Sequence, residues 1–72
     1  MKYKKIHSWD NQTLYHAMND KKMIIPFTVT NIVDKIGSLK RVECSLTGDF
    51  EVYGMKEVKK RIEHESIKVY FN

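Results

Sequence analysis

Three histidines and one cysteine are the side chains of this 72-residue chain that are typical of zinc sites and of nucleophilic or general-base catalysis near neutral pH. They are His7, His16, Cys44 and His64. Zinc sites usually place their ligands in pairs with about two to five residues between them, and no such pair occurs here. Cys44 falls at an apolar position of a predicted strand, where a cysteine is expected to be a small buried residue. The sequence therefore predicts no metal ion, no cofactor and no catalytic residue.

Motifs of enzymes are equally sparse. The sequence contains no phosphate-binding glycine loop, no dinucleotide-binding motif and no paired-carboxylate signature. His16 could act as a general acid and Tyr15 could anchor a substrate. A His and a Tyr on the surface of a helix, however, more often have no catalytic role. We predict a protein without enzymatic activity. A metal-free ribonuclease is the remote alternative, because such an enzyme can use scattered Lys, Arg and His residues without a motif.

The clearest chemical pattern is positive charge. Thirteen Lys and Arg residues against nine Asp and Glu residues give a net charge of +4. The excess lies in residues 1–22 and 55–72, whereas residues 23–54 carry more acidic than basic side chains. The candidate binding residues are the lysines of the first segment and the cations at the start of a predicted helix, namely Lys2, Lys4, Lys5, Lys21, Lys22, Lys56, Lys59, Lys60 and Arg61.

These cations favour stoichiometric binding of an anionic macromolecule, with RNA or duplex DNA as the first expectation. Lysine lacks the two-pronged geometry of arginine, so contacts would fall on phosphates and sequence specificity would be low. The alternative is a protein-interaction module, for example an inhibitor or adaptor of an acidic protein, that docks through an edge strand or exposed tyrosines. A third interpretation is that the basic surface binds no partner and only keeps the domain soluble. Lysine exceeds arginine by eleven to two, which is typical of AT-rich genes such as those of phages and low-GC bacteria.

The length allows one domain over residues 1–72, near the lower size limit for independent folding. No apolar run approaches the roughly 18 residues of a membrane-spanning helix, and residues 1–9 lack the apolar stretch of a signal peptide. A single cysteine cannot form a disulfide within the chain, as is usual in cytoplasmic proteins. We therefore expect a cytoplasmic protein that does not enter the membrane.

Residues 11–19 are predicted to form a helix. Asp10 is a suitable N-cap, and Trp9 and Leu14 have the spacing of a hydrophobic staple. Leu14 and Met18 then lie on one face at helical spacing. This apolar face is expected to pack on a sheet.

Apolar and polar residues alternate in the next three segments, which predicts three antiparallel strands. These segments are residues 23–33, 39–46 and 50–54. The lengths of the connecting turns place Val29 opposite Val42 and Cys44 opposite Val52, so that one face of the sheet is apolar. The predicted core joins this face to the apolar stripes of the helices and contains Leu14, Met18, Ile25, Phe27, Val29, Val42, Cys44, Leu46, Phe50, Val52, Val58 and Ile62.

A change to helical spacing predicts a second helix over residues 54–66, with Val58 and Ile62 buried. Residues 66–71 (SIKVYF) alternate again and are predicted to form a final strand, while residues 1–7 are either a basic arm or an edge strand. The expected fold is α+β, in the order helix, three-stranded antiparallel meander, helix, final strand (α-β-β-β-α-β). Both helices are expected on one face of the sheet.

The first five elements of this order, over residues 8–65, are similar in sequence order to those of the double-stranded RNA-binding domain. The segment "MKEVKK" after Gly54 also resembles the lysine-rich start of the second helix in that family. The resemblance implies contacts between the start of this helix and RNA. Two family features are missing, because residues 34–37 do not contain Gly-Pro-x-His and the second helix has no alanine-rich continuation.

Overall fold

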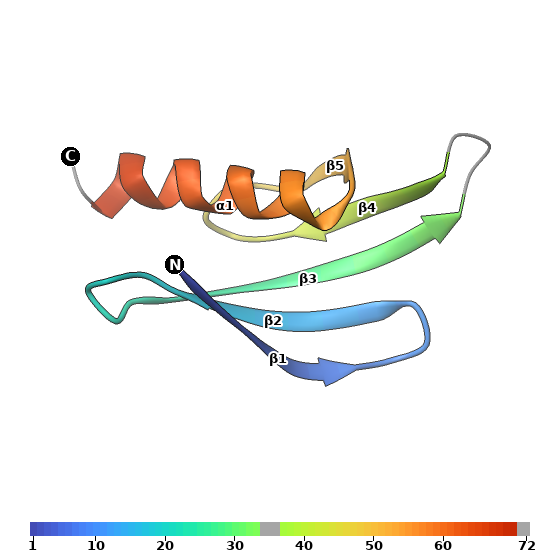
Figure 1. Ribbon diagram of the computed structural model, residues 1–72, viewed down its shortest axis with the longest axis horizontal. Coiled ribbons are helices and arrows are strands. Elements are labelled where there is room, and N and C mark those ends of the chain that lie inside the picture. Colours follow the sequence, from blue (N-terminus) through green and yellow to red (C-terminus); the bar gives the residue numbers. More distant parts are fainter. Residues whose placement is uncertain (34–36, 71–72) are drawn as a thin grey trace.

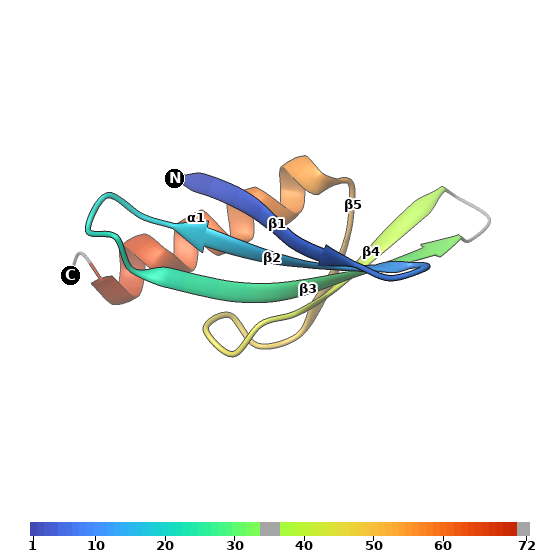
Figure 2. The same ribbon diagram turned by 90° about the horizontal axis from the view of Figure 1, so that it is seen from below.

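A computed structural model describes residues 1–33 and 37–70. The chain forms five strands and then one helix (Figure 1): β1 (Lys2–Ser8), β2 (Gln12–Met18), β3 (Ile24–Val33), β4 (Ser38–Glu43), β5 (Phe50–Tyr53) and α1 (Met55–Tyr70). The strands pair antiparallel in chain order, so β1 and β5 are the edges of one sheet. The helix lies along one face, and Figure 2 shows the sheet from its uncovered face. The predicted α-β-β-β-α-β order with two helices is therefore wrong, and the similarity of element order to the double-stranded RNA-binding domain does not hold.

Residues 11–19 contain strand β2 and not the predicted helix. β2 pairs with β1 on one side and β3 on the other, whereas so short a helix would be marginal by itself. Asp10 lies in the tight turn that precedes β2, where the Trp9 N–H donates to the Gln12 carbonyl at 2.8 Å. Trp9 is 54% exposed, contrary to the burial that the predicted staple with Leu14 requires.

The C-terminal part of the chain is also helical beyond the predicted end. Helix α1 starts after Gly54 and continues to Tyr70, through most of the predicted final strand. No glycine or proline follows Gly54 to end the helix, and Ser66 extends the buried stripe of Val58 and Ile62 by another turn. Gly54 has a φ of 91°, which lets the chain turn from β5 into α1. The last residue of the predicted strand lies outside the described residues.

The register of the strands is partly as predicted. Val29 pairs with Val42 between β3 and β4, which confirms that pairing, although most of the loop between these strands lies outside the described residues. Between β4 and β5, Val42 pairs with Phe50, so the predicted pair of Cys44 and Val52 is wrong. β4 ends before Cys44, and the connection to β5 is longer than the predicted turn. The register shift is an even number of residues, and the same side chains therefore still face the core.

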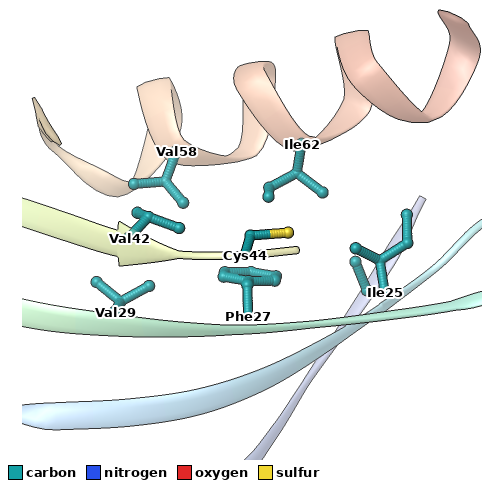
Figure 3. Close-up of a cluster of buried hydrophobic side chains, with 8 residues drawn as sticks. Ile25, Phe27, Val29, Val42, Cys44, Val58 and Ile62 are labelled. Atoms are coloured by element: carbon teal, nitrogen blue, oxygen red, sulfur yellow. The ribbon is translucent and has the colours of Figure 1, made fainter. Parts of the chain in front are cut away.

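The hydrophobic core lies between α1 and the sheet (Figure 3). Phe27 points from the sheet toward Ile62, and its ring stacks on Tyr15 at a centroid distance of 5.3 Å. Tyr3 contacts the same ring edge-on at 6.3 Å. The predicted members Leu46, Phe50 and Val52 pack around the core and are partly buried. The buried residues of the core are Ala17, Ile25, Phe27, Val29, Val42, Cys44, Val58 and Ile62.

Strand β2 carries apolar side chains on both faces of the sheet. Ala17 is fully buried on the helix side, where it pairs with Ile25. Leu14 and Met18 have the opposite parity, and Met18 pairs with Ile24 on the uncovered face. The predicted core positions of Leu14 and Met18 are therefore wrong. The prediction failed because the spacing of Leu14, Ala17 and Met18 fits one side of a helix. The same spacing also fits a central strand that has apolar side chains on both faces of the sheet.

Replacement of Phe27 by alanine tests this core. Phe27 is 1% exposed, and loss of so large a buried group should lower the free energy of unfolding by about 3 to 5 kcal/mol. Val33→Ala is the matched control, because Val33 lies in the same strand and is 88% exposed. Its effect should stay within about 0.5 kcal/mol. Urea unfolding followed by circular dichroism measures both changes, and equal losses would contradict the core.

Candidate interaction groove on the uncovered face of the sheet

The cations of α1 do not point in one direction. The Lys59 Nζ lies 4.9 Å from the centroid of the Tyr3 ring in β1. The Arg61 Cζ lies 4.9 Å from the centroid of the Phe50 ring in β5. Because β1 and β5 are opposite edges of the sheet, Lys59 and Arg61 flank the helix on opposite sides. Both contacts have cation–π geometry, which gives these two cations a role in packing within the domain.

The other two cations of the predicted helix cluster are exposed. The Lys60 Nζ lies 3.5 Å from the Glu57 Oε1, and an exposed pair of this kind contributes little to stability. Lys56 makes no such contact with any residue that the structure describes. The basic helix surface is therefore divided into separate parts.

The lysines outside the helix are also distributed over several surfaces. Lys2 and Lys4 share a parity that places them on the uncovered face of the sheet, whereas Lys5 lies on the helix side. Lys21 and Lys22 lie in the turn between β2 and β3. The nine candidate residues thus do not form one binding surface. Lys2 and Lys4 line one hollow together.

This hollow has a volume of about 420 Å³ and lies beside β1. We call it the β1 groove, and its lining residues are Lys2, Tyr3, Lys4, Ile6, His16, Met18 and Ile24. Ile6 and Ile24 are 41% and 56% exposed, so each presents an apolar side chain to water. A partner that covered them would gain about 25 cal/mol for each Å² of apolar surface removed from water.

The charged side chains of the β1 groove are all cationic. None of the described residues that line it is Asp or Glu, and Lys2 and Lys4 have no ion-pair partner in the described ranges 1–33 and 37–70. His16 adds an imidazole that can donate or accept a hydrogen bond. The groove therefore combines positive charge, hydrogen-bonding capacity and apolar surface.

β1 also offers unpaired backbone groups. It pairs with β2 on one side, and its other side is an edge of the sheet. The register shifts between Lys5 and His7, which marks a bulge or irregularity in the strand. Before this point the pairing is regular from Lys2 to Lys5. An extended peptide could form backbone hydrogen bonds along that part of the edge.

The residues considered for catalysis are not assembled into a site. Tyr15 stacks on Phe27 on the helix side, whereas His16 lies on the uncovered face. Cys44 is buried with a free thiol. Over residues 1–33 and 37–70, His, Cys, Asp and Glu side chains do not gather in groups of three that could hold a metal ion. No helix within those residues is both long and apolar enough to span a membrane.

Five groove residues are not among the nine binding residues predicted from the sequence. They are Tyr3, Ile6, His16, Met18 and Ile24. The predicted helix over residues 11–19 assigns Met18 to the core and His16 to a helix surface, and so separates both from Lys2 and Lys4. The available signal was the alternation of Lys2, Lys4 and Ile6, which places all three on one face of a strand.

Tyr3 links β1 to the helix. Its hydroxyl donates a hydrogen bond to the Glu63 Oε1 at 2.9 Å, and Lys59 covers its ring. Burial raises the pKa of the Tyr3 phenol above its usual value, and the hydrogen bond to Glu63 and the charge of that carboxylate raise it further. The phenol therefore stays protonated and continues to donate at neutral pH. This contact holds the strand that carries Lys2 and Lys4 against α1.

Comparisons with protein-family models, with curated proteins and with solved structures gave no match to this chain.

The Tyr3→Phe variant tests the link between β1 and α1. At neutral pH, loss of a hydrogen bond to a carboxylate should lower the free energy of unfolding by about 1 to 2 kcal/mol. Because the pKa of Tyr3 is raised in the folded state, the unfolded chain releases this proton first, near the usual tyrosine value of about 10. The advantage of the wild type should therefore shrink as the pH rises above about 10. Urea unfolding of both proteins at neutral and alkaline pH measures this, and a constant difference would contradict the link.

Proposed function

We propose that this protein is a non-enzymatic binding protein that holds an acidic, extended segment of a partner protein in the β1 groove, as an inhibitor or adaptor would. The composition of the groove supports this proposal. Exposed apolar side chains lie there among cations, and the described lining contains no carboxylate. A cytoplasmic setting goes with this proposal, because Cys44 is a free thiol.

The groove would select its partner by charge and by apolar contact. Lys2 and Lys4 attract Asp or Glu side chains, and exposed charges of this kind act mainly on the association rate and on the choice of partner. Burial of Ile6 and Ile24 would supply more of the affinity. A segment in which acidic and apolar residues alternate presents both kinds of side chain to this face of β1.

The edge position of β1 favours an extended segment over a helix. A peptide that pairs with an edge strand gains affinity from main-chain hydrogen bonds and specificity from alternate side chains. Here the peptide would pair along Lys2 to Lys5 and end at the irregularity that follows. Its alternate side chains would then point toward the groove.

Lysines on an edge strand have a second effect that an experiment must separate from partner binding. They oppose pairing of the edge with further copies of the same protein. If this were the only role of Lys2 and Lys4, loss of their charge would cause self-association. The proposed role instead predicts that a monomer loses affinity for an acidic segment.

RNA or duplex DNA is the second candidate partner. It is supported by the net charge of +4 and by the exposed positions of Lys56 and Lys60 on α1. Such binding would use phosphate contacts, would weaken steeply with salt and would not need the apolar side chains of the groove. The two candidates therefore differ in which lysines and which side chains they require.

Fluorescence anisotropy with defined probes tests the groove proposal. One labelled peptide alternates glutamate and leucine, a second alternates glutamate and serine, and the third probe is a short RNA duplex. We expect the leucine peptide to bind best, because only it offers both charge and apolar surface. The double variant Lys2→Glu/Lys4→Glu should weaken this binding by about tenfold or more.

The matched control reverses two cations outside the groove, in the variant Lys56→Glu/Lys60→Glu. It should bind the leucine peptide within about twofold of the wild type, because neither residue lines the groove and salt screens exposed charges. Size-exclusion chromatography of each variant detects self-association. Equal binding of the leucine and serine peptides would contradict the groove, and preferred RNA binding that is lost only in the helix variant would favour the nucleic-acid function.

A further inference from the structure

Strand β5 and the residue before it alternate acidic and apolar side chains, in the order DFEVY over residues 49–53. β5 lies at the edge of the sheet opposite to β1 (Figure 1). Among the strands that the structure describes, β5 pairs only with β4, so its outer side is a second free edge. The chain therefore carries at one edge the kind of segment that the groove at its other edge would hold.

The β5 edge is acidic on the uncovered face of the sheet. Glu51 pairs with Arg41 of β4, and the next pair, Phe50 with Val42, belongs to the core side, so Glu51 and Arg41 face away from the helix. Asp49 lines one hollow of about 320 Å³ together with Glu51 and Arg41. Both carboxylates are exposed, and neither forms an ion pair within residues 1–33 and 37–70. Two carboxylates beside one guanidinium leave this edge with a net negative charge.

The topology determines how two copies of the chain could join these edges. The four pairings from β1 to β5 are all antiparallel, so β1 and β5 run in the same direction. Two copies that lie side by side with their helices on the same face would therefore place β5 of one copy parallel to β1 of the other. The uncovered faces of the two sheets would then continue into each other.

One register of this parallel pairing matches the side chains on the uncovered face. It aligns residues 2–6 (KYKKI) of one copy with residues 49–53 (DFEVY) of the second copy. The neighbouring pairs on the uncovered face would be Lys2 with Asp49, Lys4 with Glu51, and Ile6 with Tyr53. Two of these pairs join opposite charges, which favours the pairing of adjacent strands. The third joins two apolar side chains that are 41% and 46% exposed.

The other ways of joining two edges lack this match. Pairing of two β1 edges would bring Lys2 and Lys4 of one copy against the same lysines of the other. Pairing of two β5 edges would bring carboxylates together in the same way. Like charges on adjacent strands oppose pairing. The lysines of β1 therefore act against pairing of β1 with itself and favour its pairing with β5.

We propose that the β1 groove takes residues 49–53 of a second copy of this chain, so that the protein assembles head to tail through β1 and β5. This inference rests on the proposed function, because it names one acidic, extended segment that the groove holds. The contact is heterologous, so further copies add until a ring closes or a longer chain of copies forms.

The proposed contact is weak and reversible. β5 has only four residues, and parallel pairing is slightly less stable than antiparallel pairing. We therefore expect assembly at protein concentrations of about 0.1 mM or more. An acidic segment of another protein that binds the groove more tightly would displace β5 of the second copy, and assembly and partner binding would exclude each other.

Sedimentation velocity of the full chain at concentrations from about 10 μM to 1 mM tests this proposal. We expect the wild type to form species larger than dimers, and added salt to weaken their formation. The variants Lys2→Glu/Lys4→Glu and Asp49→Lys/Glu51→Lys should each stay monomeric, because each carries like charges at both edges. An equal mixture of the two variants should assemble again, since every acidic edge then meets a basic edge.

The matched control is Glu43→Lys/Glu57→Lys. It changes the net charge as much as Asp49→Lys/Glu51→Lys does, but Glu43 lies in the inner strand β4 and Glu57 lies on the helix. It should assemble within about twofold of the wild type. Thermal melting followed by circular dichroism shows whether each variant is folded. If Asp49→Lys/Glu51→Lys does not fold, the neutral variant Asp49→Asn/Glu51→Gln replaces it and should weaken assembly severalfold.

Three outcomes would overturn the proposal. If the wild type stays monomeric at about 1 mM, β5 of a second copy does not occupy the groove. If the wild type stops at a dimer, or if both edge variants still assemble, the copies meet through another surface. If the mixture of the two variants stays monomeric, the charges of the two edges do not recognise each other.

The leucine peptide separates this inference from the proposed function. Asp49→Lys/Glu51→Lys leaves the groove residues unchanged and should bind the peptide at least as well as the wild type does. If the wild type binds the peptide but does not assemble, only the head-to-tail inference fails. If it neither binds the peptide nor assembles, the groove proposal fails as well.

Discussion

The fold depends on the contact of the Val58 and Ile62 stripe of α1 with the sheet around Phe27 (Figure 3). A sheet must bury one apolar face, and α1 is the helix that the described chain offers for this purpose. A helix is only about 10 to 12 Å wide, so it covers the middle strands best. The edge strands are reached by side chains at its two flanks, with Lys59 over Tyr3 in β1 and Arg61 over a ring in β5.

The same constraint determines where the molecule can bind a partner. One helix covers one face, so alternate side chains of every strand remain on the other face. In β1 this alternation places the Tyr3 side chain on the helix side and the Lys2 and Lys4 side chains at the groove. On the covered side, Ser66 continues the buried stripe of Val58 and Ile62 along α1. The position of the groove therefore follows from the parity of one strand and from the presence of the helix on the other face.

Alternation in β3, β4 and β5 could be read from the sequence, because most of their apolar residues lie on one face. The start of α1 was also predictable from the change of period after Gly54. Residues 11–19 were not, because Leu14, Ala17 and Met18 fit a helical stripe as well as a strand that is apolar on both faces. The pairing of these residues with β1 and β3 makes them a strand. This pairing cannot be read from the local sequence pattern. The groove was missed for the same reason, since it needs Met18 beside β1.

NMR contacts between methyl and aromatic groups show whether a single helix covers one face of the sheet and leaves the face of Met18 open. We expect nuclear Overhauser effects from the Val58 and Ile62 methyl groups to Phe27 and none to the Met18 methyl group. We also expect contacts between Met18 and Ile24 across the uncovered face. Strong contacts from Met18 to Val58 or Ile62 would contradict this arrangement, because Met18 would then belong to the core.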